Sequence, residues 1–220
     1  MTHDESSGAI LSQLSERLDI LASAAHPQLR AACRKIAVGD EFALTPAELR
    51  PMDRAIASVR RASGAARIVA KALLAELGGP PAVELPRSSA SRAPQWPSGF
   101  VGSLAHDDEF AVAAVTRVPS IRGVGIDVEP PLPLPGDLLD VIATANEREQ
   151  LKGDLVSARL LFCMKEAVYK ATYPIDGMFL EHHDVEIHLT SSVALTNSGH
   201  SLRIYAMARP RLIALALLTS

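Results

Sequence analysis

The stretch GVGIDVEP at residues 123–130 places two carboxylates, Asp127 and Glu129, two positions apart in an apolar run that is typical of a strand. Side chains at positions i and i+2 of a strand project from the same face. Two like charges held so close repel, and they need a cation, a proton or solvent between them. The stretch therefore predicts a strand that presents a paired acidic site.

A second polar motif, KEAVYK, begins at Lys165 in a segment with helical spacing. Glu166 and Lys170 are four positions apart and are therefore neighbours on one helical face. Together with Asp127 and Glu129, Glu166 could complete a carboxylate set for a hard divalent ion such as Mg²⁺. In the alternative interpretation, the motif forms a salt-bridged helix surface and the two earlier acids merely end an edge strand.

Composition excludes several classes of protein. The chain is 48% hydrophobic and 21% charged, as globular proteins are, and its net charge of −3 does not suit a broadly basic nucleic-acid surface. Two cysteines, Cys33 and Cys163, fit neither a disulfide framework nor a cysteine-based metal site. The acidic start is unlike a signal peptide, and no apolar run reaches the roughly 18 residues of a membrane span. We therefore expect a soluble, cytoplasmic protein without nucleic-acid or membrane partners.

Helical spacing of apolar residues predicts three long helices. They span residues 9–25, 52–77 and 157–172, and Pro174 is expected to end the third. Thr45 and Glu48 match the capping-box pattern, in which a threonine is followed three positions later by a glutamate. Residues 144–147 are predicted to begin a second short helix.

Apolar or alternating runs predict strands in both parts of the chain. They span residues 111–115, 121–128, 184–189 and 202–218, with a turn at Arg209 and Pro210 inside the last. Residues 102–110, which include His106, are predicted to form a turn. Helices followed by strands thus occur twice, which indicates two halves, residues 1–118 and 119–220. The glycines at 123 and 125 lack the third glycine of a dinucleotide fingerprint and predict close backbone packing instead.

Three motifs occur in a characteristic order: WPSGFVGSLAH from Trp96, GVGIDVEP from Gly123, and FCMKEAVYKATYP from Phe162. In this order they resemble the 4′-phosphopantetheinyl transferases, specifically the larger, two-halved class that activates siderophore, polyketide and nonribosomal peptide synthases. The resemblance covers about residues 55 to 190. With it, we predict an α+β fold of two similar halves related by a pseudo-two-fold, each with helices packed on a small antiparallel sheet.

The resemblance implies a transferase that moves the 4′-phosphopantetheine arm of coenzyme A onto a serine of an apo carrier protein domain. Adenosine 3′,5′-bisphosphate would be released, and the enzyme would act as a monomer. Asp127, Glu129 and Glu166 would hold Mg²⁺, or Mn²⁺ as a substitute, on the coenzyme A pyrophosphate. These metal ligands and the catalytic helix belong to the second half.

The resemblance also implies roles for the charged residues. Glu166, or a water that it positions, would take the serine proton, Lys170 would stabilise the departing bisphosphate, and Lys165 would contact phosphate. The first half would bind coenzyme A through His106 and Ser103. Four further cations suit the 3′-phosphate and pyrophosphate, because their donors fit phosphate oxygens. They are Arg67, Lys71, Arg87 and Arg92.

Two other functions stay open. The same carboxylates could serve a Mg²⁺-dependent phosphoanhydride hydrolase acting on coenzyme A-like nucleotides, or the chain could be a non-catalytic module that binds coenzyme A or a carrier. The cations near residues 54–71 likewise allow two interpretations, a solvated helix face or an anion site.

Overall fold

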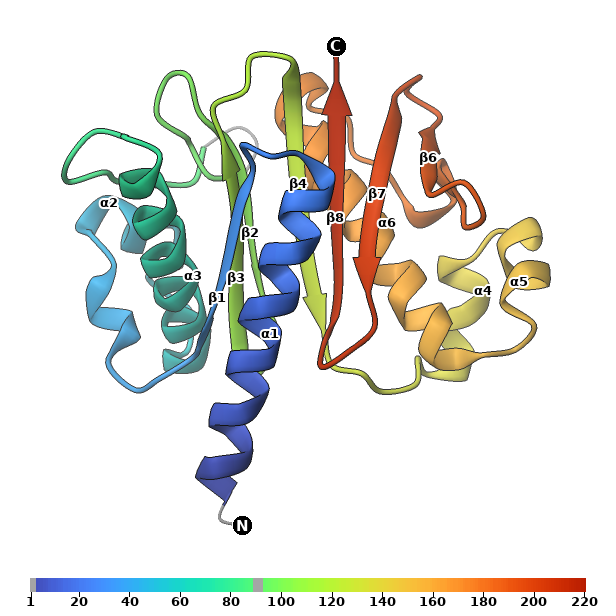
Figure 1. The fold of residues 1–220 in the computed structure, drawn as a ribbon, viewed down its shortest axis with the longest axis horizontal. Coiled ribbons are helices and arrows are strands. Elements are labelled where there is room, and N and C mark those ends of the chain that lie inside the picture. Colours follow the sequence, from blue (N-terminus) through green and yellow to red (C-terminus); the bar gives the residue numbers. More distant parts are fainter. Residues whose placement is uncertain (1–2, 89–92) are drawn as a thin grey trace. The chain divides into compact units, whose positions relative to one another are not determined.

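The computed structural model describes residues 3–88 and 93–220, and the chain divides into two compact units, Met1–Pro119 and Ser120–Ser220. Each unit combines helices with an antiparallel sheet (Figure 1). The predicted α+β class is therefore confirmed. No helix within the described residues has both the length and the apolarity that a membrane crossing requires.

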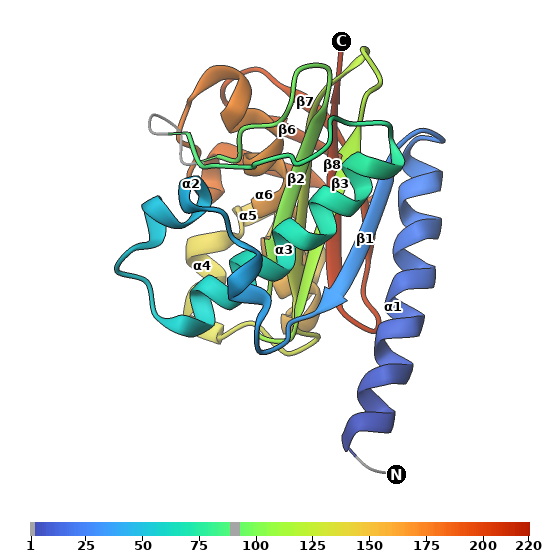
Figure 2. The ribbon, with the colours of Figure 1, turned by 90° about the vertical axis from the view of Figure 1, so that its left-hand side faces the viewer.

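The first unit has a three-stranded sheet in the order β1-β3-β2, in which both pairs are antiparallel. Its elements are α1 (His3–Ala25), β1 (Arg30–Lys35), η1 (Asp40–Ala43), α2 (Pro46–Leu49), η2 (Arg50–Met52), α3 (Ala57–Glu76), β2 (Val101–His106) and β3 (Phe110–Thr116). Helix α1 runs alongside β1, whereas α3 crosses all three strands (Figure 2).

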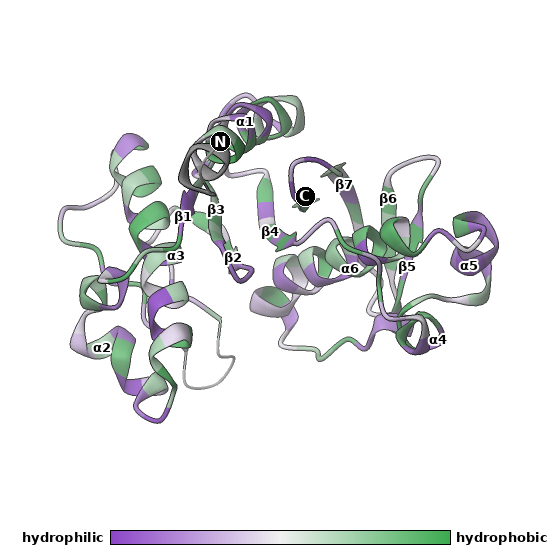
Figure 3. Cartoon of the chain, turned by 90° about the horizontal axis from the view of Figure 1, so that it is seen from below, coloured by the Kyte–Doolittle hydropathy of each residue, from purple (hydrophilic) through white to green (hydrophobic). Residues whose placement is uncertain are grey.

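The apolar spacing explains how these helices pack. On α1, Leu14, Leu18 and Ala22 are buried at positions four residues apart, so they form one stripe. Figure 3 shows both hydrophilic and hydrophobic stretches in this helix. On α3, Val69 and Leu73 are buried in a cluster with residues of β3. The predicted helix over residues 9–25 is confirmed.

The second unit has a five-stranded antiparallel sheet in the order β4-β8-β7-β6-β5. Its elements are β4 (Ile121–Glu129), η3 (Gly136–Leu138), α4 (Leu139–Ile142), α5 (Ala145–Leu151), α6 (Leu155–Asp176), η4 (His182–Asp184), β5 (Val185–His188), β6 (Val193–Thr196), β7 (Ser201–Met207) and β8 (Leu212–Thr219). Helix α6 packs on β4 and β8.

Close packing between β4 and α6 requires glycine. A Cβ atom on Gly125 would overlap the carbonyl oxygen of Ala167, and one on Gly123 would overlap that of Ala171. The prediction that these glycines permit close backbone approach is confirmed. As a result, the strand that carries Asp127 and Glu129 lies directly against the helix that carries Glu166.

The prediction of a turn over residues 102–110 was wrong for its first part. Residues 101–106 form strand β2, because pairing with β3 overrides the weak strand propensity of Gly102 and Ser103. The turn comes later, where Oδ1 of Asp107 accepts hydrogen bonds from the backbone N–H groups of Glu109 and Phe110. Strands β1 and β6 were missed altogether.

Helix boundaries also differ from the prediction, and α1 begins at His3 rather than at residue 9. The long helix of the first unit begins at Ala57 rather than at residue 52, after a separate turn closed by a hydrogen bond from Ala55 N to Met52 O. Helix α6 continues past Pro174 and ends before Gly177, whose φ of 66° favours glycine. A proline in the last turn removes only one hydrogen bond, and the Ile175 side chain beyond it packs near Gly123 of β4.

Candidate active site

The first of the two acidic residues near the end of β4 is buried. Asp127 is 7% exposed, and its Oδ1 lies 2.6 Å from Nζ of Lys170 on α6. Oδ2 is buried without a hydrogen-bond partner among the described residues, although the weakly polar Cys163 thiol lies nearby. Burial raises the pKa of Asp127 above its ordinary value, the Lys170 ammonium opposes the shift, and the charge of Glu166 adds to it.

Lys170 places a positive charge beside the Asp127 carboxylate. Burial acts to lower its pKa, but the neighbouring Asp127 carboxylate outweighs burial and raises the pKa above its ordinary value. The ammonium also approaches the Ile126 carbonyl oxygen at 3.5 Å. The pairing with Asp127 therefore favours the charged form of Lys170.

The other two predicted ligands each have a charged or ionisable neighbour. Oε2 of Glu129 lies 2.8 Å from Nη1 of Arg159, and Oε1 of Glu166 lies 3.4 Å from Nε2 of His182. Among residues 3–88 and 93–220, no three His, Cys, Asp or Glu side chains are gathered closely enough to hold a metal ion. The metal-ligand set therefore stays a prediction.

The donor chemistry nevertheless fits a hard divalent cation. Asp127 pairs with Lys170 and Glu129 pairs with Arg159, both on α6, so the two acids lie on the α6 side of β4. The buried Asp127 Oδ2, which has no described hydrogen-bond partner, is a carboxylate oxygen, the ligand type that Mg²⁺ prefers.

Lys165, predicted to contact phosphate, is enclosed instead. The residue is 1% exposed, and its Nζ lies 2.7 Å from Oε2 of Glu147 and 2.8 Å from the carbonyl oxygen of His182. Burial lowers its pKa and the Glu147 carboxylate opposes that shift. Its described contacts are therefore with α5 and with the turn at η4.

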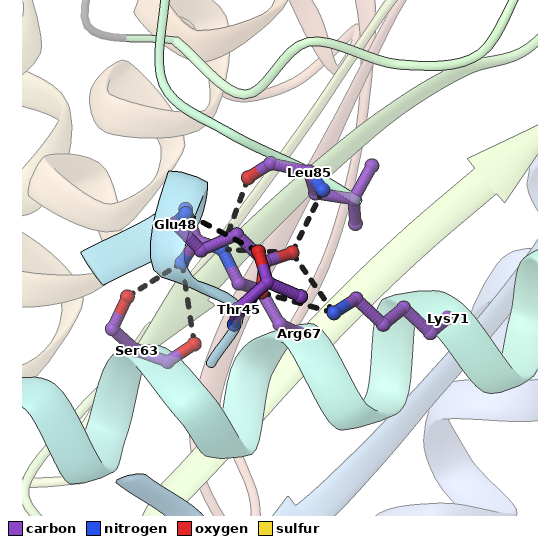
Figure 4. A network of polar contacts seen from close by, with 6 residues as sticks. All are labelled: Thr45, Glu48, Ser63, Arg67, Lys71 and Leu85. Atoms are coloured by element: carbon purple, nitrogen blue, oxygen red, sulfur yellow. Dashed lines mark hydrogen bonds and ion pairs between the residues drawn. The ribbon is translucent and has the colours of Figure 1, made fainter. Parts of the chain in front are cut away.

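Arg67 and Lys71 of α3 lie in a similar network, shown in Figure 4. Arg67, 1% exposed, donates from Nε to the Leu85 carbonyl oxygen at 3.0 Å and from Nη1 to Ser63 Oγ at 2.5 Å. Lys71 Nζ lies 2.9 Å from Oε1 of Glu48, and Arg67 Nε lies 3.8 Å from the same oxygen. Nη2 of Arg67 is buried with no hydrogen-bond partner among the described residues.

The remaining predicted coenzyme A contacts lie on β2 and in the loop before it. Burial lowers the pKa of Arg67, Glu48 opposes that shift, and the charge of Arg87 adds to it, so Arg87 lies near Arg67. Ser103 is buried on β2 and His106 is exposed at its end. Arg92, also predicted to bind phosphate, falls outside the described residues.

Each unit has a cavity beside these groups. In the second unit, a cavity of about 660 Å³ is lined by Glu166, His182 and several apolar or aromatic side chains, among them Tyr169 and Phe179. In the first unit, a cavity of about 520 Å³ is lined by Lys71 and the segment after α3. Glu166, a predicted catalytic residue, and Lys71, a predicted phosphate contact, thus each line a cavity.

Sequence reasoning missed three partners of the predicted site. Arg159 on Glu129 and His182 beside Glu166 have no local sequence signal, because both contacts join segments that are distant along the chain. Glu147 lies in a predicted helix start, but that pattern does not reveal that its carboxylate also binds Lys165.

Comparison with protein families gives two adjacent matches. Residues 47–116 match the 4′-phosphopantetheinyl transferase N-terminal domain, and residues 123–211 match the 4′-phosphopantetheinyl transferase superfamily. The two matches follow one another along the chain, as the two units do. Helix α1 and strand β1 precede the first match.

Several characterised proteins are similar to the chain. The 4′-phosphopantetheinyl transferase Npt of Nocardia iowensis is 39% identical over 158 residues, which cover 70% of each protein. The transferase Svp of Streptomyces mobaraensis is 39% identical over 66% of this chain and 60% of its own length. Enterobactin synthase component D of Salmonella typhimurium is 33% identical over 63% of each. The chain thus spans somewhat less than two thirds of two of these three relatives.

Proposed function

Because the chain belongs to the 4′-phosphopantetheinyl transferase superfamily, we propose that it transfers the phosphopantetheine arm of coenzyme A to a serine of an apo carrier domain. The serine oxygen attacks the phosphorus that bears the pantetheine arm. The bond from that phosphorus to the bridging oxygen of the pyrophosphate breaks, and adenosine 3′,5′-bisphosphate leaves. The serine proton must pass to a base.

One observation carries the proposal. Asp127 is buried, pairs with Lys170 through one oxygen and has no described hydrogen-bond partner on the other, and the charge of Glu166 helps to raise its pKa. Asp127, Glu129 and Glu166 are the residues that would hold Mg²⁺, with Mn²⁺ as a substitute. When bound, the metal offsets negative charge on the pyrophosphate. Glu129 would then exchange its contact with Arg159 for one with the metal.

The protein's own groups handle the proton and the leaving group. Glu166 borders the cavity of the second unit and is the proposed acceptor of the serine proton, directly or through a water. The Asp127 carboxylate raises the pKa of Lys170, so the ammonium remains charged and can stabilise the departing bisphosphate.

The first unit would bind the adenosine bisphosphate part of coenzyme A. His106 is exposed and Arg87 is half-buried, so both can reach a ligand without unfolding. Lys71 borders the cavity of the first unit, and Arg67 keeps one nitrogen without a described partner. These residues, with Ser103 and Arg92, remain the proposed contacts for the phosphates of coenzyme A.

The carrier substrate is proposed from a relative. Enterobactin synthase component D bears the name of a siderophore synthase, so carrier domains of siderophore and other peptide or polyketide synthases are the first to test. We also propose that the protein acts as a cytoplasmic monomer.

The test is a panel of apo carrier domains incubated with the protein, coenzyme A and Mg²⁺, with the carrier mass as readout. We expect at least one carrier to gain the mass of phosphopantetheine and to lose that gain when its serine is changed to alanine. Coenzyme A cleavage at an equal rate without a carrier would instead indicate a hydrolase. Binding of coenzyme A without either reaction would indicate a non-catalytic module.

A further inference from the structure

A buried ion pair in the second unit joins α5 to α6. Glu147 is fully buried and Lys165 is 1% exposed, with 2.7 Å between Oε2 and Nζ. Oε2 also accepts the backbone N–H of Thr144 at 2.8 Å, and Oε1 accepts the N–H of Ile187 at 2.7 Å. One carboxylate therefore contacts the start of α5, the middle of α6 and strand β5.

Lys165 extends this contact to the turn that precedes β5. Its Nζ donates to the His182 carbonyl oxygen at 2.8 Å, and the same oxygen accepts the N–H of Val185. The backbone at residue 182 is therefore fixed to α6 by a buried, charged donor, which makes a stronger hydrogen bond than a neutral one.

The side chain at this fixed position meets the proposed base. Nε2 of His182 lies 3.4 Å from Oε1 of Glu166 without a hydrogen bond between them, and the imidazole centroid lies 5.4 Å from the ring centroid of Phe162. A shift of the turn would therefore move the imidazole away from Glu166. Glu147 thus binds Lys165, and Lys165 binds the His182 backbone. The His182 side chain lies beside the Glu166 carboxylate.

The first unit contains a similar arrangement of contacts around Glu48. The buried Glu48 accepts the N–H of its own capping threonine at 2.9 Å and the N–H of Leu85 at 2.7 Å. Lys71 of the long helix pairs with that carboxylate, and Arg67 of the same helix donates to the Leu85 carbonyl oxygen (Figure 4). In both units a capping-box glutamate and cations of the long helix hold the segment that follows that helix.

We propose that Glu147 and Lys165 are positioning residues, which place His182 beside Glu166, and that Lys165 is not a phosphate ligand. The proposal deepens the proposed function and rests on it for its kinetic consequences. A lysine that is 1% exposed and already bound to a carboxylate and a carbonyl has little free donor capacity for a phosphate.

The kinetic test compares Glu147→Gln, Lys165→Met and the double variant, with Glu149→Gln, an exposed neighbour on α5, as the matched control. We expect each single variant to lower kcat by about ten- to a hundredfold with the KM for coenzyme A within about twofold of the wild type. The kcat of the double variant should be no lower than that of Lys165→Met, because both substitutions remove the same ion pair. Lys165→Arg should recover part of the rate.

The opposite result would be a raised KM for coenzyme A in Lys165→Met, together with wild-type kcat and KM in Glu147→Gln. That result would make Lys165 a direct phosphate ligand and overturn the proposal. Additive losses in the double variant would also contradict it, because they would mean that the two residues act separately.

A second measurement does not depend on activity. In Lys165→Met, hydrogen exchange of the backbone amides of Asp184 and Val185 should accelerate, whereas exchange in β8 should stay unchanged. Unchanged exchange at both amides would overturn the proposal even if the enzyme is active. If no carrier is modified by the wild type, the proposed function fails, and the exchange measurement still decides whether the pair holds the turn.

Discussion

Gly125 of β4 lies against the backbone of Ala167 on α6 so closely that a methyl group on the glycine would overlap the Ala167 carbonyl oxygen. The overlapping atom belongs to a helix backbone, which cannot move aside as the end of a flexible side chain can. The contact sets the spacing between the strand with the acids and the helix with Glu166 and Lys170.

Gly125→Ala should therefore destabilise the protein. Overpacking at a rigid contact costs about 1–3 kcal/mol or more, because strand and helix must separate. Gly136→Ala is the matched control, since a methyl group there meets nothing within 4 Å. Urea denaturation of both variants checks this, and equal free energies of unfolding would contradict the packing argument.

Asp127→Asn and Glu166→Gln should abolish carrier modification and keep the fold. Both substitutions preserve side-chain size but remove a negative charge from the proposed metal ligands. The measurements are carrier mass after incubation and the circular dichroism spectrum. Asp137→Asn, at an exposed acid of the same unit, is the control that should keep full activity.

Removal of divalent ions should have the same effect on the wild type. We expect a chelator to stop transfer and added Mg²⁺ or Mn²⁺ to restore it. Full transfer in chelator, or near-wild-type turnover of either variant, would refute the assignment of these carboxylates as metal ligands.

Glu48 should make stability depend on pH. Burial acts to raise its pKa, but hydrogen bonds from the Thr45 and Leu85 backbones and from Lys71 outweigh burial and hold the pKa below its ordinary value of 4.5. A lowered pKa in the folded state stabilises the protein above pH 4.5, and this contribution is lost as the pH falls through the folded-state value.

Glu48→Gln should thus be less stable than the wild type at pH 7, by about 3–5 kcal/mol, because it leaves Arg67 and Lys71 without their carboxylate. Its stability should also fall less steeply than that of the wild type below pH 4.5. Urea denaturation at several pH values measures both effects. Glu84→Gln, at an exposed glutamate, is the control. If the free energy of unfolding of Glu48→Gln and of the wild type changed in parallel with pH, Glu48 would not be the source of the pH dependence.

Cys163 should be chemically inert despite its place beside the KE motif. It is fully buried, and burial followed by the charge of Asp127 raises its pKa well above the ordinary value, so little thiolate forms. Iodoacetamide should not label it in the native protein, and Cys163→Ala should retain transfer. Rapid labelling of Cys163 before unfolding would contradict this.

Much of the fold could be predicted because its signals are local. The apolar spacing that predicts α1 involves residues close together in the sequence. The same is true of Gly123 and Gly125, which predict the close packing of β4. The errors fell where tertiary pairing decides: Gly102 and Ser103 have weak strand propensity, and they form β2 because β3 supplies the partner.

The same division applies to the candidate site. The sequence by itself determined which residue types stand in which motif: two acids in alternation on a strand, a glutamate and a lysine four apart on a helix, and a capping box before Pro46. Only the tertiary structure decided their partners. It buried Asp127 against Lys170 and enclosed Lys165 between Glu147 and the His182 carbonyl. The reason is that burial and the pairing of charges depend on segments far apart in the chain, and these come together only when helix and sheet pack.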